Sequence, residues 1–224
     1  MRMRRKKNLE GRLEACGDMI IFFRCEDKNA KTTCEVKEYI DFSEIFGNDN
    51  PVYLEIGCGK GGFAIEFAKR NPDINLLAME KVANVVVEGA EKAIEAGVTK
   101  NLRFISGGAE YLTKFVAPET VSRIFLNFSC PYPKNQYANC RLTNINFLER
   151  YKQIIKPDTE IHQKTDNMHF FEYSIEQYTK AGFALKNVSL DLHNSSFEGN
   201  IITEYENRFS SMGMPIYRLE AYLR

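Results

Sequence analysis

The sequence predicts an α/β fold, in which a mostly parallel sheet carries helices on both faces and an antiparallel strand at one edge. From residue 51 onward, short apolar runs alternate with stretches of helical spacing, a pattern typical of strands joined by crossover helices. The last two apolar runs have no long helix between them, so the final strand can pair antiparallel. With 224 residues, 44% of them hydrophobic, the chain suits one domain with a short extension.

The elements are expected in a regular order after a break at residues 47–51, where Gly, Asn, Asp and Pro cluster. Residues 13–46 show no clear period and are expected to be irregular, except for a helical turn over 41–46. The predicted strands cover residues 52–56, 75–79, 101–105, 123–128, 159–164, 183–190 and 216–223. The predicted helices cover about 62–70, 82–96, 109–115, 144–155 and 168–181, and a short one begins at Thr203.

The first twelve residues are strongly basic, with six Lys and Arg side chains against the single Glu10, although the formal net charge of the chain is zero. Such an arm can lie along a phosphate backbone, and a solvated terminus would have the same composition. We therefore expect a basic arm and extension over residues 1–45 and one domain over residues 46–224.

The composition also indicates the cellular compartment and argues against some classes of protein. The basic start is not followed by an apolar run, and the apolar stretch 19–23 is far too short to cross a bilayer, so we expect a cytoplasmic protein without membrane contact. Six cysteines without a C-x-x-C pair argue against a zinc site and a disulfide framework. We expect no metal, and a monomer or a homodimer.

A glycine-rich turn after the first predicted strand is the strongest local signal of a binding site. Gly57, Gly59 and Gly61 permit positive φ and leave no side chain between the turn and a ligand lying across it. A nucleotide-like cofactor fits such a turn. Gly57, Gly59 and Gly62 also match the dinucleotide pattern G-x-G-x-x-G, which is weak by itself.

Two acids near this turn favour one cofactor over the other. Glu55 lies at the end of the first strand, where a pyrophosphate would be repelled, whereas S-adenosylmethionine brings an ammonium and a sulfonium. Glu80 ends the second strand about 20 residues after the glycines, as expected for a group that binds ribose hydroxyls. S-adenosylmethionine is the favoured cofactor, and a nicotinamide-dependent oxidoreductase remains an alternative.

Other polar groups also follow the predicted strands, and each has a structural interpretation beside the functional one. Asp166 could cap the helix that follows it, and Thr203 with Glu206 forms a capping box. Lys134 and Arg141 could contact phosphates, or could lie in a solvated loop. In an open α/β sheet these groups would meet at the rim formed by the carboxyl ends of the strands.

The succession of motifs resembles the bacterial tRNA (guanine-N7)-methyltransferase family over nearly the whole chain from residue 46 to 224. The resemblance implies a Rossmann-like class I methyltransferase with a seven-stranded sheet. It also implies methyl transfer from S-adenosylmethionine to N7 of a guanosine in the tRNA variable loop, with S-adenosylhomocysteine as product. The motifs are Glu55-Ile-Gly-Cys-Gly-Lys-Gly61, Asn71-Pro-Asp-Ile-Asn75, Leu126-Asn-Phe-Ser129, Pro131-Tyr-Pro-Lys134, Lys164-Thr-Asp-Asn167, Asp191-Leu-His-Asn-Ser195, Glu198-Gly-Asn200 and Thr203-Glu-Tyr-Glu206.

The resemblance also implies roles for particular residues. Asp166 is the expected catalytic acid, and it matches a substrate-binding position as well. The expected cofactor-binding residues are Glu55, Gly57, Gly59, Gly61, Glu80, Gly108, Ala109 and Asn127. The other expected substrate-binding residues are Lys134, Thr203, Glu204 and Glu206.

The chain departs from the family pattern at three places. Cys130 stands where the family has an acid regarded as catalytic. The acid expected beside the adenine falls on Gly108, which leaves the backbone of Gly108 and Ala109, with Glu110 nearby. Residues 135–141 carry little of the usual positive charge.

We still expect an active enzyme, because guanine N7 has a free lone pair and needs no base to expose it. The alternatives are a tRNA-binding homologue with impaired catalysis and a methyltransferase acting on another substrate.

Overall fold

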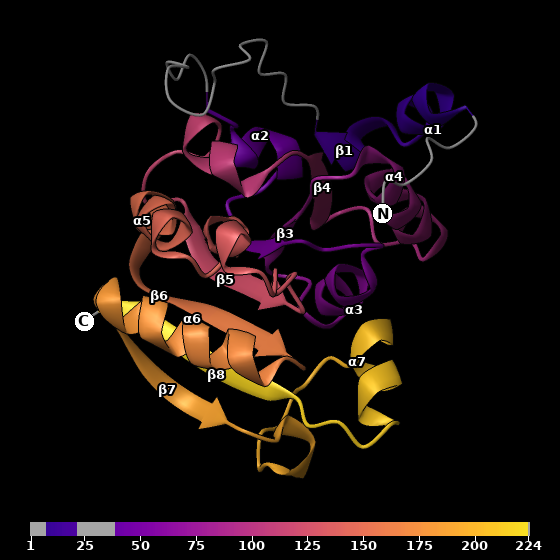
Figure 1. The fold of residues 1–224 in the computed structure, drawn as a ribbon. Helices are drawn as coiled ribbons and strands as arrows, with labels where there is room; N and C mark the ends of the chain where they lie inside the picture. Colours follow the sequence, from indigo (N-terminus) through magenta and orange to yellow (C-terminus); the bar gives the residue numbers. More distant parts are fainter. Residues whose placement is uncertain (1–7, 22–38, 224) are drawn as a thin grey trace.

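Eight strands form one continuous sheet in the computed structural model, which describes residues 8–21 and 39–223 (Figure 1). Their order across the sheet is β1-β4-β3-β2-β5-β6-β8-β7. Every pairing is parallel except those of β8 with β6 and β7. The strands are β1 Ile20–Ile21, β2 Val52–Ile56, β3 Asn75–Glu80, β4 Leu102–Ser106, β5 Val121–Asn127, β6 Ile155–Thr165, β7 Phe183–Ser189 and β8 Tyr217–Leu223.

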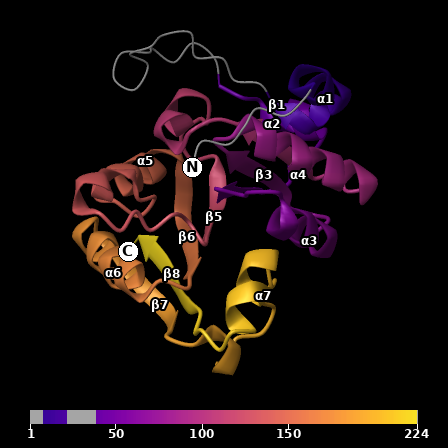
Figure 2. The same ribbon diagram turned by 45° about the vertical axis from the view of Figure 1, so that its right-hand side comes forward.

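Helices cover both faces of the sheet (Figures 1 and 2). One layer packs around α2, α5 and α6, and the other around α1, α3 and α4. The α-helices are α1 Leu9–Ala15, α2 Phe42–Phe46, α3 Gly62–Arg70, α4 Ala83–Glu95, α5 Ile145–Ile154, α6 Met168–Lys180 and α7 Glu204–Ser210. Short 3₁₀ helices are η1 Gly17–Met19, η2 Ala109–Lys114, η3 Asn135–Cys140 and η4 Leu192–Asn194.

The alternation of side chains along the strands divides the core into these two layers. In β2, Leu54 and Ile56 face the α5 layer, whereas Tyr53 packs with the α3 layer. Glu55 has the same parity as Tyr53 and is buried on that side, at the strand's carboxyl end. The sheet therefore places this carboxylate beneath the glycine turn and next to β5.

The strand order reverses between β2 and β5, which makes this position the topological switch point of the sheet. From β2 the chain proceeds through β3 to β4 on one side, and from β5 it proceeds to β6 on the other. Ligands of open α/β sheets bind outside the carboxyl ends of the strands at such a point. Glu80 and Ser106 are register partners at the ends of β3 and β4, as Asn127 and Lys164 are in β5 and β6.

All seven strands expected from the sequence are present, and the predicted fold class is confirmed. The final strand runs antiparallel, but it lies between β6 and β7, so that β7 forms the edge. The physical reason is burial: Arg218, Leu219, Glu220 and Ala221 of β8 are all buried, whereas much of β7 is exposed. A strand that is buried along its length is stabilised by a neighbour on each side, because both neighbours satisfy its backbone hydrogen bonds.

The prediction of an irregular segment over residues 13–46 is wrong for residues 13–21, and residues 22–38 lie outside the described residues. Helix α1 packs on α4, where Arg12 Nε donates to Glu91 Oε1 at 2.7 Å, and β1 pairs with β4 as an eighth strand. The predicted turn over 41–46 is confirmed as α2, which the side chain of Asp41 caps. The remaining five basic residues of the arm lie outside the described residues. Within residues 8–21 and 39–223 no helix is both long and apolar enough to cross a membrane.

Candidate active site

The glycine turn after β2 has the backbone that the sequence predicts. Gly57 and Gly59 have φ of 82° and 54°, and a Cβ on either would meet nothing within 4 Å. The amides of Gly57 and Cys58 both donate to the carbonyl of Met79, at 2.8 and 3.0 Å, so the turn is fixed against β3. Gly61, with φ of 75°, caps α3, and a Cβ there would lie 3.0 Å from the Phe104 ring. The first two glycines keep the turn open to a ligand, and the third is needed for packing.

Glu80 connects the ends of β2 and β3. Its Oε2 accepts from the Gly59 amide at 3.3 Å, and its Oε1 accepts from the Val82 amide at 3.0 Å. The carboxylate is thereby held at the rim, half-buried, with a defined orientation. An acid in this position can accept further hydrogen bonds from a pair of hydroxyl groups.

Glu55 is the most deeply buried acid of the glycine turn, at 2% exposure. Its Oε1 accepts from Asn127 Nδ2 at 3.0 Å, whereas its Oε2 has no hydrogen-bond partner among the residues that the structure describes. Burial raises the pKa of Glu55 to about 7, and the Asn127 bond and the charge of Lys164 oppose that rise. A buried carboxyl oxygen without a partner is costly, so this position favours a ligand that supplies a donor or a positive charge.

A cavity of about 480 Å³ opens beside these groups at the carboxyl rim of the sheet. Its wall includes Gly57 and Glu80, the turn at Gly108 and Ala109, and the loop at Cys130. Its size lies in the range of pockets for cofactors. Together with the orphaned oxygen of Glu55 and the open turn, a cavity of this size suits a cofactor that carries a positive charge, and Lys81 and Arg150 also line its wall.

The loop after β5 is held in an unusual conformation. Phe128 and Tyr132 have φ of 51° and 41°, which is rare for residues other than glycine. Buried Arg141 fixes this loop, because its Nε donates to the carbonyl of Pro131 at 2.9 Å and its terminal nitrogen donates to that of Tyr132 at 3.0 Å. The interpretation of Arg141 as a phosphate contact is therefore wrong: its guanidinium is 4.2 Å from the Tyr173 ring and belongs to the scaffold.

Asp166 follows β6 directly and is not a helix cap. The cap of α6 is Asn167, whose side chain accepts from the Phe170 amide at 2.8 Å. Burial raises the pKa of the Tyr205 hydroxyl, and the nearby Asp166 and Cys130 raise it further. The structure therefore brings Asp166, Tyr205 and the exposed Cys130 together, beside the cavity that Cys130 lines.

A buried ion pair joins α7 to β6. Lys164 Nζ donates to Glu206 Oε2 at 2.6 Å and also to the side chain of Asn200 and the carbonyl of Ile201. Glu206 is fully buried, and its Oε1 accepts from Asn200 at 2.6 Å. Burial lowers the pKa of Lys164, against the opposing effect of Glu206. The expected substrate contact of Glu206 is not available in this structure, because protein groups already hold both of its oxygens.

The other expected substrate-binding residues are nearer the surface. Thr203 caps α7 by accepting from the Glu206 amide at 2.9 Å, which confirms the capping half of the box. Glu204 is exposed and lies 3.4 Å from Lys92 of α4. Lys134 is exposed at the start of η3. Of the expected site residues, Gly57, Glu80, Gly108, Ala109 and Cys130 line the cavity, whereas Lys134, Thr203 and Glu204 do not.

Lys164 is the residue that sequence reasoning left without a role, although it stands in a quoted motif. The available signal was its position in a strand whose neighbours Gln163 and Thr165 are also polar, while the strand itself lies in the middle of the sheet. Such a lysine must have partners when it is buried.

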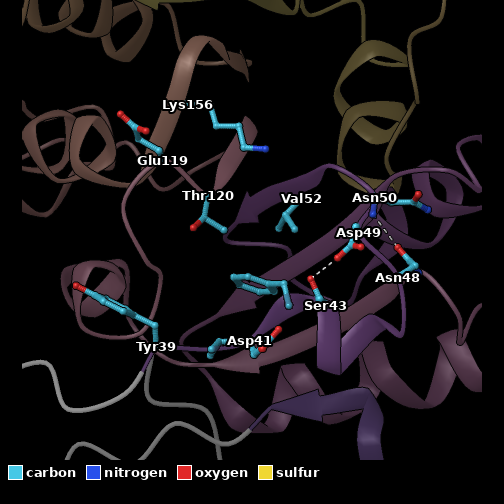
Figure 3. Close-up of a pocket in the computed structure, with 12 residues that line it drawn as sticks. Tyr39, Asp41, Ser43, Asn48, Asp49, Asn50, Val52, Glu119, Thr120 and Lys156 are labelled. Atoms are coloured by element: carbon cyan, nitrogen blue, oxygen red, sulfur yellow. Dashed lines mark hydrogen bonds between the residues drawn. The ribbon is translucent and has the colours of Figure 1, made fainter.

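Two further cavities are present, and the first of them reaches the rim at Asn127 and Lys164. One, of about 310 Å³, follows the α3 face of β5 between Phe67 and Phe197. The other, of about 500 Å³, lies at the amino ends of β2 and β6, where Val52 and Lys156 line it (Figure 3). Figure 3 shows Ser43 and Asp49 hydrogen-bonded to each other at its edge, at 2.6 Å. Because the amino ends of parallel strands are remote from the switch point, this second cavity is not the active site.

Among the described residues, Glu160, His162 and Glu220 lie close enough to hold a metal ion. Arg123 and Lys186 already pair with Glu160, and Arg218 pairs with Glu220. Burial lowers the pKa of His162 to about 4, against its bond to Glu160. Three cations around two carboxylates neutralise this cluster, so we assign no metal to it.

The geometry agrees with the comparisons with known proteins. Residues 49–219 match a family model described as "Putative methyltransferase". Relatives named tRNA (guanine-N(7)-)-methyltransferase include that of Bacillus cytotoxicus, 48% identical over 82% of this chain and 84% of the relative. That of Listeria monocytogenes serotype 4b is 49% identical over 80% of this chain and 83% of the relative.

Solved structures share the fold at low sequence identity. An antibiotic-related methyltransferase is 17% identical with a TM-score of 0.63, over 87% of this chain and 98% of that one. The 16S rRNA methyltransferase KamB is 17% identical with a TM-score of 0.61, over 84% of this chain and 96% of that one. The family model covers most of the domain, and the relatives are nearly half identical to it, so this chain belongs to the tRNA (guanine-N(7)-)-methyltransferase family.

Proposed function

We propose that the protein transfers the methyl group of S-adenosylmethionine to N7 of a guanosine in tRNA, in the variable loop. The observation that carries the proposal is the cavity at the switch point, bounded by the glycine turn, by Glu80 and by the loop of Cys130, with Asp166 and Cys130 both near Tyr205. The names of the relatives support the substrate. Because tRNA is the substrate, we place the work of the protein in the cytoplasm.

The residues of the glycine turn hold the methyl donor in this proposal. Gly57, Gly59 and Gly61 let its chain lie against the backbone, and Glu80 accepts hydrogen bonds from its ribose hydroxyls. The orphaned oxygen of Glu55 faces its positive charge, with Asn127 fixing that carboxylate. S-adenosylmethionine supplies, when bound, an electrophilic methyl group on a sulfonium.

The chemistry at guanine requires alignment and electrostatic stabilisation more than proton transfer. N7 attacks through its lone pair, the bond from methyl to sulfur breaks, and the purine becomes cationic while S-adenosylhomocysteine leaves. Asp166 accepts from the N1 and N2 hydrogens of the base and stabilises the developing charge. Thr203 and Glu204 at the start of α7, together with Lys134, contact the surrounding nucleotides.

Cys130 weakens the electrostatic stabilisation of the methylated purine without abolishing it. A carboxylate at this position would add a second negative charge near the purine, and one preorganised group of this kind is worth on the order of 10²-fold in rate. The thiol is exposed at the cavity wall, where it contributes little charge stabilisation. We therefore propose a slow enzyme.

The experiment is transfer of a labelled methyl group from S-adenosylmethionine to unmodified tRNA, followed by identification of the modified nucleoside. We expect 7-methylguanosine from the wild type and a loss of about 10²-fold or more in Asp166→Ala. Methylation at another atom or of another RNA would refute the proposal.

A second function is a tRNA-binding homologue with impaired catalysis, which the thiol at Cys130 favours. The same assay separates the two. Product from Cys130→Asp but none from the wild type would establish the binding homologue.

A further inference from the structure

The buried apolar layer on the α3 side of the sheet ends at β5. Within the described residues this layer includes Phe67 of α3, Phe125 of β5 and Ile201, and it takes no residue from β6, β7 or β8. Figures 1 and 2 show α7 beside α3 on this side of the sheet. The cavity of about 310 Å³ lies between α3 and the segment 197–201, over β5, β6 and β8, and we call it the α3 groove.

Phenyl rings form one part of the lining of the α3 groove. Phe63, Phe67 and Phe125 pack against one another, with centroid distances of 5.7, 4.9 and 5.1 Å for the three ring pairs. Phe197 lines the other wall, and 38% of it is exposed. These rings offer flat apolar surfaces to a planar ligand.

Cations form the other part of the lining, and no Asp or Glu of the described chain lines the groove. The cations are Arg70, Arg123, Lys164 and Arg218. Each of them pairs with an acid that lies outside the lining, namely Glu66, Glu160, Glu206 and Glu220 in the same order. The acids hold the cations in place, while the charged groups that a ligand meets in the groove are positive.

Two of the guanidinium groups have N–H donors beyond those that their acids use. Arg218 is only 3% exposed, and its guanidinium carbon lies 3.7 Å from the centroid of the Phe197 ring. It donates to Glu220 from one terminal nitrogen. Arg123 donates to Glu160 at 3.0 Å in the same way, and its Nε is buried without a partner among the described residues. Because a guanidinium has five N–H donors and a buried donor without an acceptor is costly, the groove favours a ligand rich in acceptors.

The α3 groove begins beside the active site. It reaches the rim of the sheet at Asn127 and Lys164, and Asn127 also donates to Glu55 at 3.0 Å. An enzyme that modifies a base takes this base out of its stack, which leaves the neighbouring nucleotide unstacked as well. A neighbour of the target guanosine therefore needs a surface of its own close to the rim.

We propose that the α3 groove binds one nucleotide of the tRNA next to the methylated guanosine, with its base against Phe67 and Phe197 and its phosphate at Arg123 and Arg218. The inference rests on the proposed function, since it takes tRNA as the substrate. Rings that stack a base, beside cations that hold its phosphate, are the combination by which proteins bind single-stranded nucleic acids. The volume lies at the lower end of the range for ligand sites, which suits a single nucleotide.

The first test measures the dissociation constant of unmodified tRNA by filter binding. Phe197→Ala should weaken binding at least about fivefold, because it removes a stacking partner of the base. Phe197→Tyr keeps a ring and should stay within about twofold of the wild type. The matched control is Tyr39→Ala, which removes a ring of similar exposure, 42%, at the amino ends of the strands and should leave the affinity unchanged. Circular dichroism verifies that each variant is folded.

The cations are tested by the salt dependence of the same binding. Arg123→Gln should reduce the slope of log affinity against log salt concentration by about 0.7–0.9, because one phosphate contact is lost. Lys180→Gln removes an exposed cation on α6, across the sheet from the groove, and should leave the slope unchanged. An unchanged slope in Arg123→Gln would overturn the phosphate contact.

Photochemical cross-linking locates the bound nucleotide. Two tRNA transcripts carry 5-iodouridine, one on each side of the target guanosine, and the cross-linked protein is digested with trypsin. One transcript should cross-link at Phe67 or Phe197, which lie in the tryptic peptides 61–69 and 187–208 and are identified by fragmentation. Cross-links confined to other residues would overturn the proposal.

A free nucleotide has the same chemistry as a nucleotide of the RNA, so a further arm separates the two sources. Calorimetry measures binding of AMP and UMP to the protein saturated with S-adenosylhomocysteine. If Phe197→Ala loses the binding of a free nucleotide but keeps the wild-type affinity for tRNA, the groove serves a free nucleotide and the proposal is overturned.

The outcomes also distinguish this inference from the proposed function. If the wild type forms 7-methylguanosine but Phe197→Ala loses less than about fivefold in tRNA affinity, the role of the groove is refuted and the methyltransferase proposal stands. If the wild type binds tRNA and forms no 7-methylguanosine, the proposed function fails, and the tRNA affinity of Phe197→Ala still decides the role of the groove.

Discussion

Glu206→Ala should strongly destabilise the protein, although the residue lies outside the cofactor cavity. In the wild type all three N–H groups of the Lys164 ammonium are used, by Glu206 at 2.6 Å, Ile201 at 2.9 Å and Asn200 at 3.0 Å. The two charged side chains are only 7% and 0% exposed. Removal of the carboxylate leaves a buried, uncompensated charge, which costs about 3–5 kcal/mol.

This cost is a large share of the total stability, which is about 5–15 kcal/mol for a typical domain. The free energy of unfolding is measured by urea titration, followed by circular dichroism. The matched control is Glu176→Ala, which removes the carboxylate of an exposed pair with Lys180 on α6. This change should cost less than about 0.5 kcal/mol. The double variant Lys164→Met and Glu206→Leu should recover at least about 2 kcal/mol, since it removes both buried charges.

A loss below about 1 kcal/mol in Glu206→Ala would refute this reasoning, because it would mean that water reaches Lys164 in the folded state. A double variant no more stable than Glu206→Ala would also contradict it. In that case the loss would come from packing of α7 and not from the unpaired charge.

Three other variants test the site and its electrostatics. Affinity for S-adenosylhomocysteine should rise with pH through about 7, where buried Glu55 becomes ionised, and Glu55→Gln should flatten this dependence in calorimetric titrations. Cys130→Asp should increase kcat for tRNA methylation, by up to about 10²-fold, with a smaller change in KM; an unchanged kcat would show that this acid is dispensable. Burial raises the pKa of Glu160, but hydrogen bonds from Lys186 and His162 and nearby positive charges outweigh it and hold the pKa at about 2 in the folded state. The stability that this carboxylate contributes is therefore lost as the pH falls from about 4.5 to 2. Glu160→Gln should remove this part of the acid sensitivity, on the order of 2 kcal/mol, in urea titrations at pH 3 and pH 7.

The order of strands and helices from residue 51 onward was available from sequence because it rests on local signals. Apolar runs of five to seven residues, the glycines at residues 57–61 and the prolines at 131, 133 and 157 each act on their own neighbourhood. The acids at the strand ends followed from the same reasoning, since the carboxyl ends of parallel strands share one rim. Glu55, Glu80 and Asp166 were identified in this way.

Other features depend on residues far apart in the chain. Strand β1 is two residues long, and only its pairing with β4 makes it a strand. For Arg141 the sequence left a phosphate contact and a solvated loop as alternatives, because its charge is visible in the sequence, whereas the carbonyls that bind it are visible only in the fold. Lys164 and Glu206 are 42 residues apart, and their burial as a pair had no local signal.

The sequence by itself determined the class of fold, the glycine turn and the identity of the acids around it, because backbone freedom and apolar periodicity are properties of neighbouring residues. The tertiary structure decided which of those groups face the cavity and which hold the scaffold. The burial and the pairing of a side chain depend on residues from distant segments that pack against it. Such packing leaves one oxygen of Glu55 without a partner, buries Glu206 and places the Glu110 carboxylate next to Gly108.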